Sequence, residues 1–181
     1  MKFKTLAILT ILPILFFTAC DSKSDKNQKP TINSAEKQFN LNTINNSQIN
    51  ISLNQDKIIL KDTNDKIVLL NFFTTWCPAC KVEISNLVQI QETYKNDIVV
   101  VGILLEEMKT NDEIKQFMKE HNINYDVINS PESMELAKAV GGIKSIPTMF
   151  LIDKKNSIFQ KYVGIVPNEM MEIDIKKVLE K

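Results

Sequence analysis

Two cysteines three positions apart, Cys77 and Cys80, carry the clearest chemical signal in this chain. They lie in the segment Trp-Cys-Pro-Ala-Cys, where an apolar run ends and a helical pattern begins. This spacing puts both sulfurs on one side of the first helical turn, close enough to bond. Unpaired backbone N–H groups and the positive end of the helix dipole meet at the first cysteine and stabilise its thiolate. The pattern predicts a pair that alternates between dithiol and disulfide.

The two cysteines are expected to have different roles. In the reductive direction, the Cys77 thiolate attacks a disulfide on another protein and forms a mixed disulfide. Cys80, one turn into the helix and expected to be less exposed, then attacks Cys77 and releases the reduced substrate. The same steps run backwards in oxidation. Between the cysteines, Pro78 suits the first helical position because its missing N–H would have had no partner there, and Ala79 completes the motif.

Two structural uses of the pair compete with this interpretation. Half of a zinc site would need two further ligands, yet the chain has one histidine, His121, and one other cysteine, Cys20. A purely structural disulfide would close so short a loop that it would add little stability. The sequence therefore predicts no metal site and favours a redox pair.

Composition limits the remaining classes of function. The chain has 181 residues, which suits one domain with some extra length. Its 22 basic residues, all lysines, balance 22 acidic residues, so the net charge is zero. Nucleic-acid binding would require a basic excess, and we predict none. Three cysteines are too few for a disulfide-stapled scaffold.

The N-terminus has the pattern of an export signal. Residues 1–19 combine a basic start, an apolar run and small residues at the end. The run is shorter than the roughly 20 residues that a membrane-spanning helix needs, although an uncleaved anchor remains the alternative. Residues 17–20 resemble the lipobox of bacterial lipoproteins, which implies that Cys20 is lipidated and becomes the mature N-terminus. Asp21 resembles an inner-membrane retention signal.

The rest of the chain divides into a tether and one domain. Residues 20–36 begin with the lipidated cysteine and form a polar, flexible tether by composition, and residues 37–181 form the domain. Buried or edge strands are indicated by apolar runs at 48–53, 57–60, 67–73, 97–105, 147–152 and 158–165. Helices are indicated at 78–94, from the capping box at Thr110, from Ser130-Pro131 to Gly141-Gly142, and at 167–179. Strands that alternate with helices predict an α/β sandwich.

The chain resembles thioredoxins, and more closely the membrane-tethered TlpA/ResA-like branch that includes cytochrome c maturation reductases. Residues 69–81 (LLNFFTTWCPACK) match the active-site strand and turn, Ile146-Pro147-Thr148 matches the cis-proline loop, and Gly164 fits the glycine of the last strand. The resemblance implies an α/β thioredoxin fold, with a central mixed sheet flanked by helices. It also implies an N-terminal β-hairpin extension, and an insertion between the second strand and the cis-proline loop.

The resemblance assigns a role to the cis-proline loop. An X–Pro bond adopts the cis form at little extra cost. A cis bond before Pro147 would turn the Ile146 backbone toward Cys77, where the loop, including Thr148, could contact a substrate strand and block metal capture. The alternative is an ordinary proline at the start of a strand.

The chain departs from the thioredoxin pattern at three places. Asn71 stands where thioredoxins carry a buried aspartate that assists proton transfer, and asparagine cannot titrate, so that role is vacant or moved. The dipeptide Pro78-Ala79 differs from the usual Gly-Pro, so the reduction potential cannot be carried over. Ser85 replaces a helix-kinking proline, which predicts a straighter first helix.

Several other side chains could bear on the motif. Glu83, Glu106 and Glu107 could tune a cysteine pKa, although solvated or helix-capping carboxylates are the favoured interpretation. We expect Trp76 to cover the site and to pack against it, and His121 to lie at the end of a surface helix.

Together these features imply a periplasmic thiol–disulfide oxidoreductase, lipid-anchored at Cys20 on the inner membrane and working without a cofactor. The resemblance favours a protein-disulfide reductase whose leading substrates are apocytochrome c cysteines. Its partners would be proteins with cysteine pairs and a transmembrane protein that delivers electrons.

Three alternatives to a reductase stay open at this point. The enzyme could instead oxidise its substrates, or the dithiol could hold Cu(I) as a copper chaperone, with help from Met149, although that methionine is expected in the core. A thiol peroxidase shares the fold but would need an activating arginine, and the chain has none.

Overall fold

The computed structural model describes residues 37–107 and 109–180. The predicted signal peptide, the lipidated Cys20 and the tether therefore lie outside the described residues, and they stay predictions. Within the described ranges, no helix is long and apolar enough to cross a membrane.

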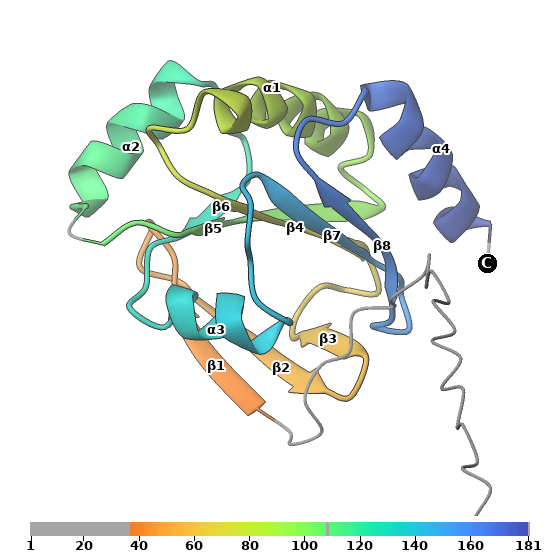
Figure 1. Ribbon diagram of the computed structural model, residues 1–181. Coiled ribbons are helices and arrows are strands. Elements are labelled where there is room, and N and C mark those ends of the chain that lie inside the picture. The colour runs from red at the N-terminus through yellow and green to blue at the C-terminus, as the bar shows by residue number, and fades with distance from the viewer. Residues whose placement is uncertain (1–36, 108, 181) are drawn as a thin grey trace, which may run out of the picture.

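A five-stranded mixed sheet forms the centre of the domain, in the order β6-β5-β4-β7-β8 (Figure 1). Its parallel strands are β4 (Ile67–Phe73), β5 (Ile98–Leu104) and β6 (Asp126–Ile128), and its antiparallel strands are β7 (Thr148–Ile152) and β8 (Ile158–Val163). One face is covered by α1 (Pro78–Thr93), α2 (Asn111–Glu120) and α4 (Asn168–Leu179), and the other by α3 (Ser133–Ala139) with a second sheet. The predicted central mixed sheet flanked by helices is confirmed.

The central strand β4 explains why the sheet is covered on both faces. All seven of its residues are buried. Because side chains alternate along a strand, Leu69 and Phe73 pack under α1, whereas Leu70 and Phe72 pack on the opposite side. The near-continuous apolar run thus produces a strand buried on both faces, as predicted.

The second sheet contains the predicted hairpin and one further strand. β2 (Gln48–Asn54) and β3 (Lys57–Leu60) pair in antiparallel fashion, and β1 (Lys37–Asn42) adds to the other edge of β2. Buried side chains such as Leu41 and Ile51 face the central sheet. The extension is therefore a three-stranded sheet that closes the core beneath β4.

The segment between β5 and β7, where an insertion is predicted, folds as α2, β6 and α3. The capping box at the start of α2 is confirmed, because Thr110 and Glu113 each accept a hydrogen bond from the other's backbone N–H. The predicted start of the next helix is wrong: α3 begins at Ser133, and Pro131 precedes it. The Ser130 hydroxyl bonds to the Glu132 carboxylate, and the Ser130 carbonyl accepts from Ser133 N–H, so this stretch forms a turn instead.

Candidate active site

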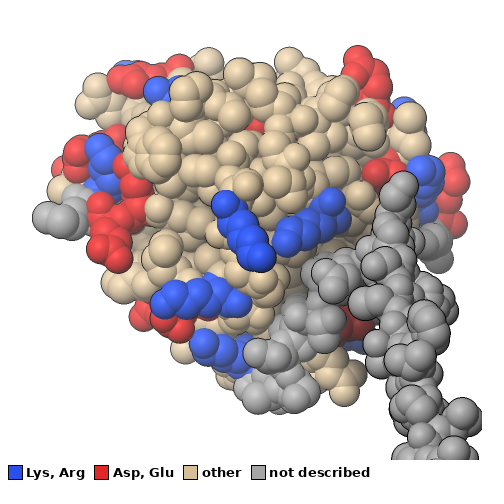
Figure 2. All heavy atoms as spheres, viewed as in Figure 1, with Lys and Arg blue, Asp and Glu red and all other residues tan. Residues whose placement is uncertain are grey.

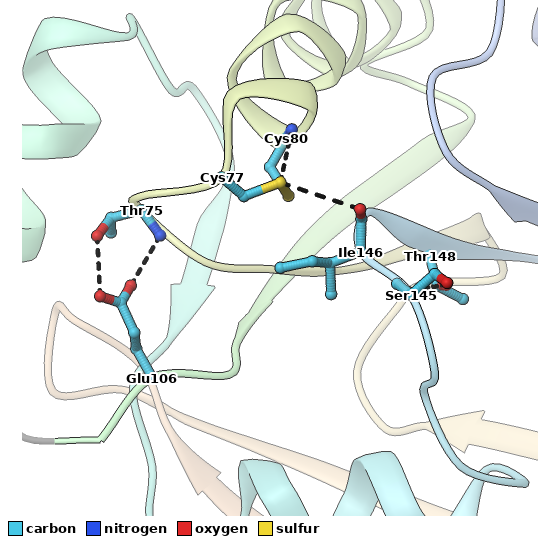
Figure 3. The surroundings of a disulfide bond; sticks show 7 residues. All are labelled: Thr75, Cys77, Cys80, Glu106, Ser145, Ile146 and Thr148. Atoms are coloured by element: carbon cyan, nitrogen blue, oxygen red, sulfur yellow. Dashed lines mark hydrogen bonds between the residues drawn. A yellow bond between two sulfur atoms is a disulfide. The ribbon is translucent and has the colours of Figure 1, made fainter.

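Cys77 and Cys80 form a disulfide where β4 leads into α1 (Figure 3). Their Cα atoms are 5.2 Å apart. Cys77 is the N-cap of α1 in an extended conformation, Pro78 is the first helical residue, and the Cys80 N–H points at Cys77 Sγ over 3.1 Å. A thiolate at Cys77 would therefore receive a backbone hydrogen bond at the positive end of the helix, as the motif predicts.

The two sulfurs differ in their surroundings. Cys80 is fully buried, whereas Cys77 keeps 5% of its surface exposed, so the predicted order of exposure is confirmed. The neighbouring Trp76 is 66% exposed. The expectation that its ring packs is wrong, because Trp76 lies in the turn before α1 and its side chain extends into solvent. Its role as a cover stays a prediction.

The cis-proline loop reaches the disulfide from the far end of the chain. The Ile146–Pro147 peptide bond is cis, as predicted, and the Ile146 carbonyl oxygen lies 3.9 Å from Cys77 Sγ (Figure 3). The Thr148 hydroxyl donates to the Ser145 carbonyl over 2.6 Å. The Pro147 carbonyl accepts from Gly164 N–H over 2.8 Å, so the last strand holds the loop in place. Gly164 has a φ of 84°, which favours glycine.

Glu106 holds the chain just before the redox motif. One of its carboxylate oxygens accepts from Thr75 N–H over 2.7 Å, and the other accepts from the Thr75 hydroxyl over 3.1 Å (Figure 3). The favoured interpretation of Glu106 as a solvated or helix-capping carboxylate is therefore wrong, since it fastens the loop that carries Trp76 and Cys77. Its neighbour Glu107 is exposed, as expected.

Glu83 is buried in the core one turn beyond Cys80. Its side chain is fully shielded from solvent, so the favoured interpretation as a solvated carboxylate is also wrong here. One oxygen accepts from Val166 N–H over 3.0 Å and from the Asn86 amide over 3.3 Å. Burial raises the pKa of the Glu83 carboxyl above its ordinary value, and these two hydrogen bonds offset only part of that rise. Residues at i and i+3 share a helix face, so Glu83 lies on the same buried face as Cys80.

This burial predicts how stability depends on pH. A group whose pKa is raised in the folded protein costs stability as pH climbs from its ordinary value, near 4.5, through the raised value. We expect Glu83→Gln to remove that decline, because glutamine keeps an acceptor for Val166 N–H but carries no charge. In thermal unfolding between pH 4 and pH 8, the melting temperature of the variant should rise relative to that of the wild type as the pH increases.

The matched control for this prediction is Glu92→Gln. Glu92 lies on the same helix, but 70% of its side chain is exposed, so its replacement should leave the pH profile unchanged. Parallel curves for Glu83→Gln and the wild type would mean that the Glu83 carboxyl titrates as it does in water.

The remaining candidate residues lie at several places in the fold. Asn71 is fully buried on β4. Met149 is fully buried in the core, and His121 caps the end of α2 with its ring 4.4 Å from that of Phe117, as predicted for both. Across residues 37–107 and 109–180, no three metal-ligating side chains lie together.

A buried tyrosine next to Asn71, Tyr125, was not among the residues singled out from the sequence, which carried no signal for it.

The AhpC/TSA family model matches residues 32–161, well over half of the chain. The chain belongs to the AhpC/TSA family. This member is 29% identical over 176 residues to the thiol-disulfide oxidoreductase ResA of Bacillus thuringiensis subsp. konkukian, an alignment that covers 97% of this chain and 95% of that protein. It is 32% identical over 124 residues to ResA of Bacillus anthracis, covering 67% and 69% of the two chains.

Solved structures agree with this assignment. A thiol:disulfide interchange protein of the thioredoxin family from Chlorobium tepidum TLS superposes with a TM-score of 0.60 at 25% identity, covering 84% of this chain and 99% of that one. The resemblance to ResA-like proteins is thereby confirmed. This AhpC/TSA family member is a thiol–disulfide oxidoreductase with a thioredoxin fold.

Proposed function

We propose that Cys77 is the attacking nucleophile and Cys80 the resolving thiol of a protein-disulfide reductase. The observation that carries this proposal is the position of Cys77 as N-cap of α1, with the Cys80 N–H aimed at its sulfur. The positive end of the helix and the Cys80 N–H both stabilise a thiolate at Cys77 rather than at Cys80. The small exposed fraction of Cys77 supports the same order of attack.

Glu83 suits the resolving step. Resolution requires the buried Cys80 thiol to lose its proton before it attacks the mixed disulfide. A carboxylate with a raised pKa on the same helix face is a suitable acceptor, because its proton affinity lies closer to neutral pH. Asn71 cannot serve in this way, so the proton acceptor has moved from the strand to the helix.

The surface around the disulfide suits a protein substrate. The side of the molecule over α1 is mostly uncharged, whereas acidic and basic side chains gather elsewhere in that view (Figure 2). Trp76, Val82 and Ile165 are each at least half exposed, and the Ile146 carbonyl lies 3.9 Å from Cys77 Sγ. Uncharged segments that carry a disulfide, such as those of apocytochrome c, are the substrate class that we propose.

The location follows from the N-terminal pattern. We propose that residues 1–19 direct export, that lipidated Cys20 anchors the chain to the outer side of the inner membrane, and that a transmembrane protein supplies electrons. Several acyl chains on one N-terminus hold a protein firmly at a bilayer. A reductase outside the cytoplasm must be recharged from within, which is the reason for the electron-delivering partner.

Trapping in cells tests this function. In Cys80→Ser protein, the mixed disulfide at Cys77 cannot be resolved, so substrates should stay covalently bound and be released by reductant. We expect apocytochrome c to be among the trapped proteins. Cys77→Ser protein is the control and should trap nothing. A potential measured near −120 mV, the oxidising end of the range for such proteins, would reverse the proposed direction.

A further inference from the structure

Residues 74–77 connect the end of β4 to the start of α1, and Cys77 is the last of them. The side chains along this connection differ in what they contact. The Thr74 hydroxyl is buried without a hydrogen-bond partner among the described residues, and Trp76 is 66% exposed. Thr75, in contrast, is bonded to the segment that follows β5. Whatever holds Thr75 therefore also helps to place Cys77, two residues later.

The contact between Thr75 and Glu106 has two points. The carboxylate accepts one hydrogen bond from the Thr75 backbone over 2.7 Å and one from the Thr75 hydroxyl over 3.1 Å. Hydrogen bonds to an ionised acceptor are shorter and stronger than those between neutral groups. Figure 3 shows Glu106 and Ile146 on either side of the turn that carries Cys77. The turn is thus held from the β5 side, and the cis-proline loop faces its sulfur from the other.

The redox state decides how much this contact matters. In the disulfide, the bond between the two sulfurs keeps Cys77 next to Cys80. After reduction that bond is gone, and the Cys77 thiolate keeps the Cys80 N–H only if its backbone stays in place. The Cys77 carbonyl accepts from Lys81 N–H over 3.2 Å, but this bond restrains the helix side only. The Thr75 contact restrains the chain before Cys77.

We propose that Glu106 is a positioning residue for the Cys77 thiolate, because it fixes Thr75 and so keeps the sulfur within reach of the Cys80 N–H in the reduced protein. This inference rests on the proposed role of Cys77 as the attacking thiol. In that attack, the thiolate supplies the electron pair for a bond to one substrate sulfur. The bond between the two substrate sulfurs breaks, and the other sulfur leaves as a thiolate. Glu106 exchanges no proton or electron in this step.

Position and charge predict opposite effects of Glu106 on Cys77. The negative charge of a carboxylate disfavours a nearby thiolate, so charge alone would raise the pKa of Cys77. A carboxylate that keeps the thiolate against an N–H donor lowers that pKa. The structure favours position, because both carboxylate oxygens are engaged by Thr75. In addition, Glu106 is partly exposed, so that water and salt screen its charge.

The charged groups around this contact come from several elements. Glu107 and Lys109 line, together with Glu106, a cavity of about 380 Å³. Lys109 pairs with Glu113 of α2 over 3.2 Å, whereas Glu107 is exposed. On α1, the buried Glu83 is the same in every variant considered below. Glu107 therefore offers a matched control: it has the same charge and is next in the chain, and its side chain faces solvent.

The test measures the pKa of the Cys77 thiol. Reduced full-length protein is alkylated with iodoacetamide between pH 4 and pH 10, and mass spectrometry follows the Cys77 peptide. We expect Glu106→Ala to raise the midpoint of the pH profile by about one unit. Glu106→Gln should stay close to the wild-type midpoint, since its amide can accept from Thr75 N–H and donate to the Thr75 hydroxyl. Glu107→Ala should leave the midpoint unchanged.

A second variant separates the two hydrogen bonds. Thr75→Val keeps the backbone bond to Glu106 and loses the hydroxyl bond, so the midpoint should rise by less than in Glu106→Ala. In the double variant, the rise should equal that of Glu106→Ala alone, because the hydroxyl acts through the carboxylate. Thr75→Val carries the test if Glu106→Ala does not fold, and an unchanged midpoint in Thr75→Val would then refute the inference.

Two further results would overturn the inference. One is a midpoint that falls or stays the same in Glu106→Ala, which would mean that charge outweighs position. The other is an equal rise in Glu106→Ala and Glu106→Gln, because the glutamine retains the contact. The proposed function is tested separately, since Cys80→Ser protein with Glu106 intact must still trap substrates on Cys77, whatever the midpoints of the Glu106 variants.

Discussion

Cys77→Ser should lower the rate of disulfide exchange by about a thousandfold or more, since the variant lacks the attacking nucleophile. The reason is positional. Cys77 is the cysteine at the helix tip with some exposed surface, whereas Cys80 is fully buried. Cys80 therefore cannot take over the first attack. Reduction of a peptide disulfide, followed by mass spectrometry, measures both the rate and the adduct.

Cys80→Ser is the matched variant for this experiment. It should still react once with a disulfide and stop as a mixed disulfide on Cys77, because the resolving thiol is gone. Alkylation of the reduced wild type near neutral pH should modify Cys77 first. Preferential modification of Cys80, or equal exchange rates in the two variants, would contradict the assigned roles.

Phe72→Ala should destabilise the fold by about 3–5 kcal/mol, the usual cost of removing a large aromatic side chain from a core. Phe72 is fully buried, and its ring meets that of Phe150 edge to face, with centroids 5.9 Å apart. It lies in the core between the central sheet and the three-stranded sheet. Urea unfolding measures the loss.

This variant also separates stability from chemistry. Phe72 points away from α1, so the protein that remains folded should exchange disulfides at the wild-type rate. Ile173→Ala is the control, because that side chain is 53% exposed and its loss should change stability by less than about 0.5 kcal/mol. A loss below about 1 kcal/mol for Phe72→Ala, well under the usual range, would mean that the two sheets are loosely packed.

The elements near the redox motif were predictable because their signals are local. The run in β4, the cysteine spacing, Pro78 and the capping box at Thr110 each act within a few residues. By contrast, β1 and β6 were missed as separate strands. β1 has only two buried side chains among its six residues, and β6 is three residues long and is held by pairing with β5, far earlier in the chain. The start of α3 was predicted too early. The hydrogen bond between the Ser130 hydroxyl and the Glu132 carboxylate stabilises a non-helical turn at Pro131, where the first turn of the helix was expected.

Charged residues show the same division between local and distant causes. Glu83 and Glu92 lie on one helix and look alike in sequence, yet Glu83 is buried under Val166 while Glu92 faces solvent. Glu106 gained a structural role because Thr75, 31 positions earlier, lies within reach of its carboxylate. Neither outcome has a signal in the neighbouring residues.

The amino-acid sequence by itself determined the chemistry of this protein: two thiols one helical turn apart, at the tip of a helix that follows a buried strand. Tertiary structure alone decided which carboxylate lies beside Cys80, which loop meets Cys77 and which tyrosine reaches Asn71. The physical reason is distance along the chain. Bonding reach between Cys77 and Cys80 depends on four consecutive residues, whereas burial and pKa depend on segments that meet only when the sheet and its helices have assembled.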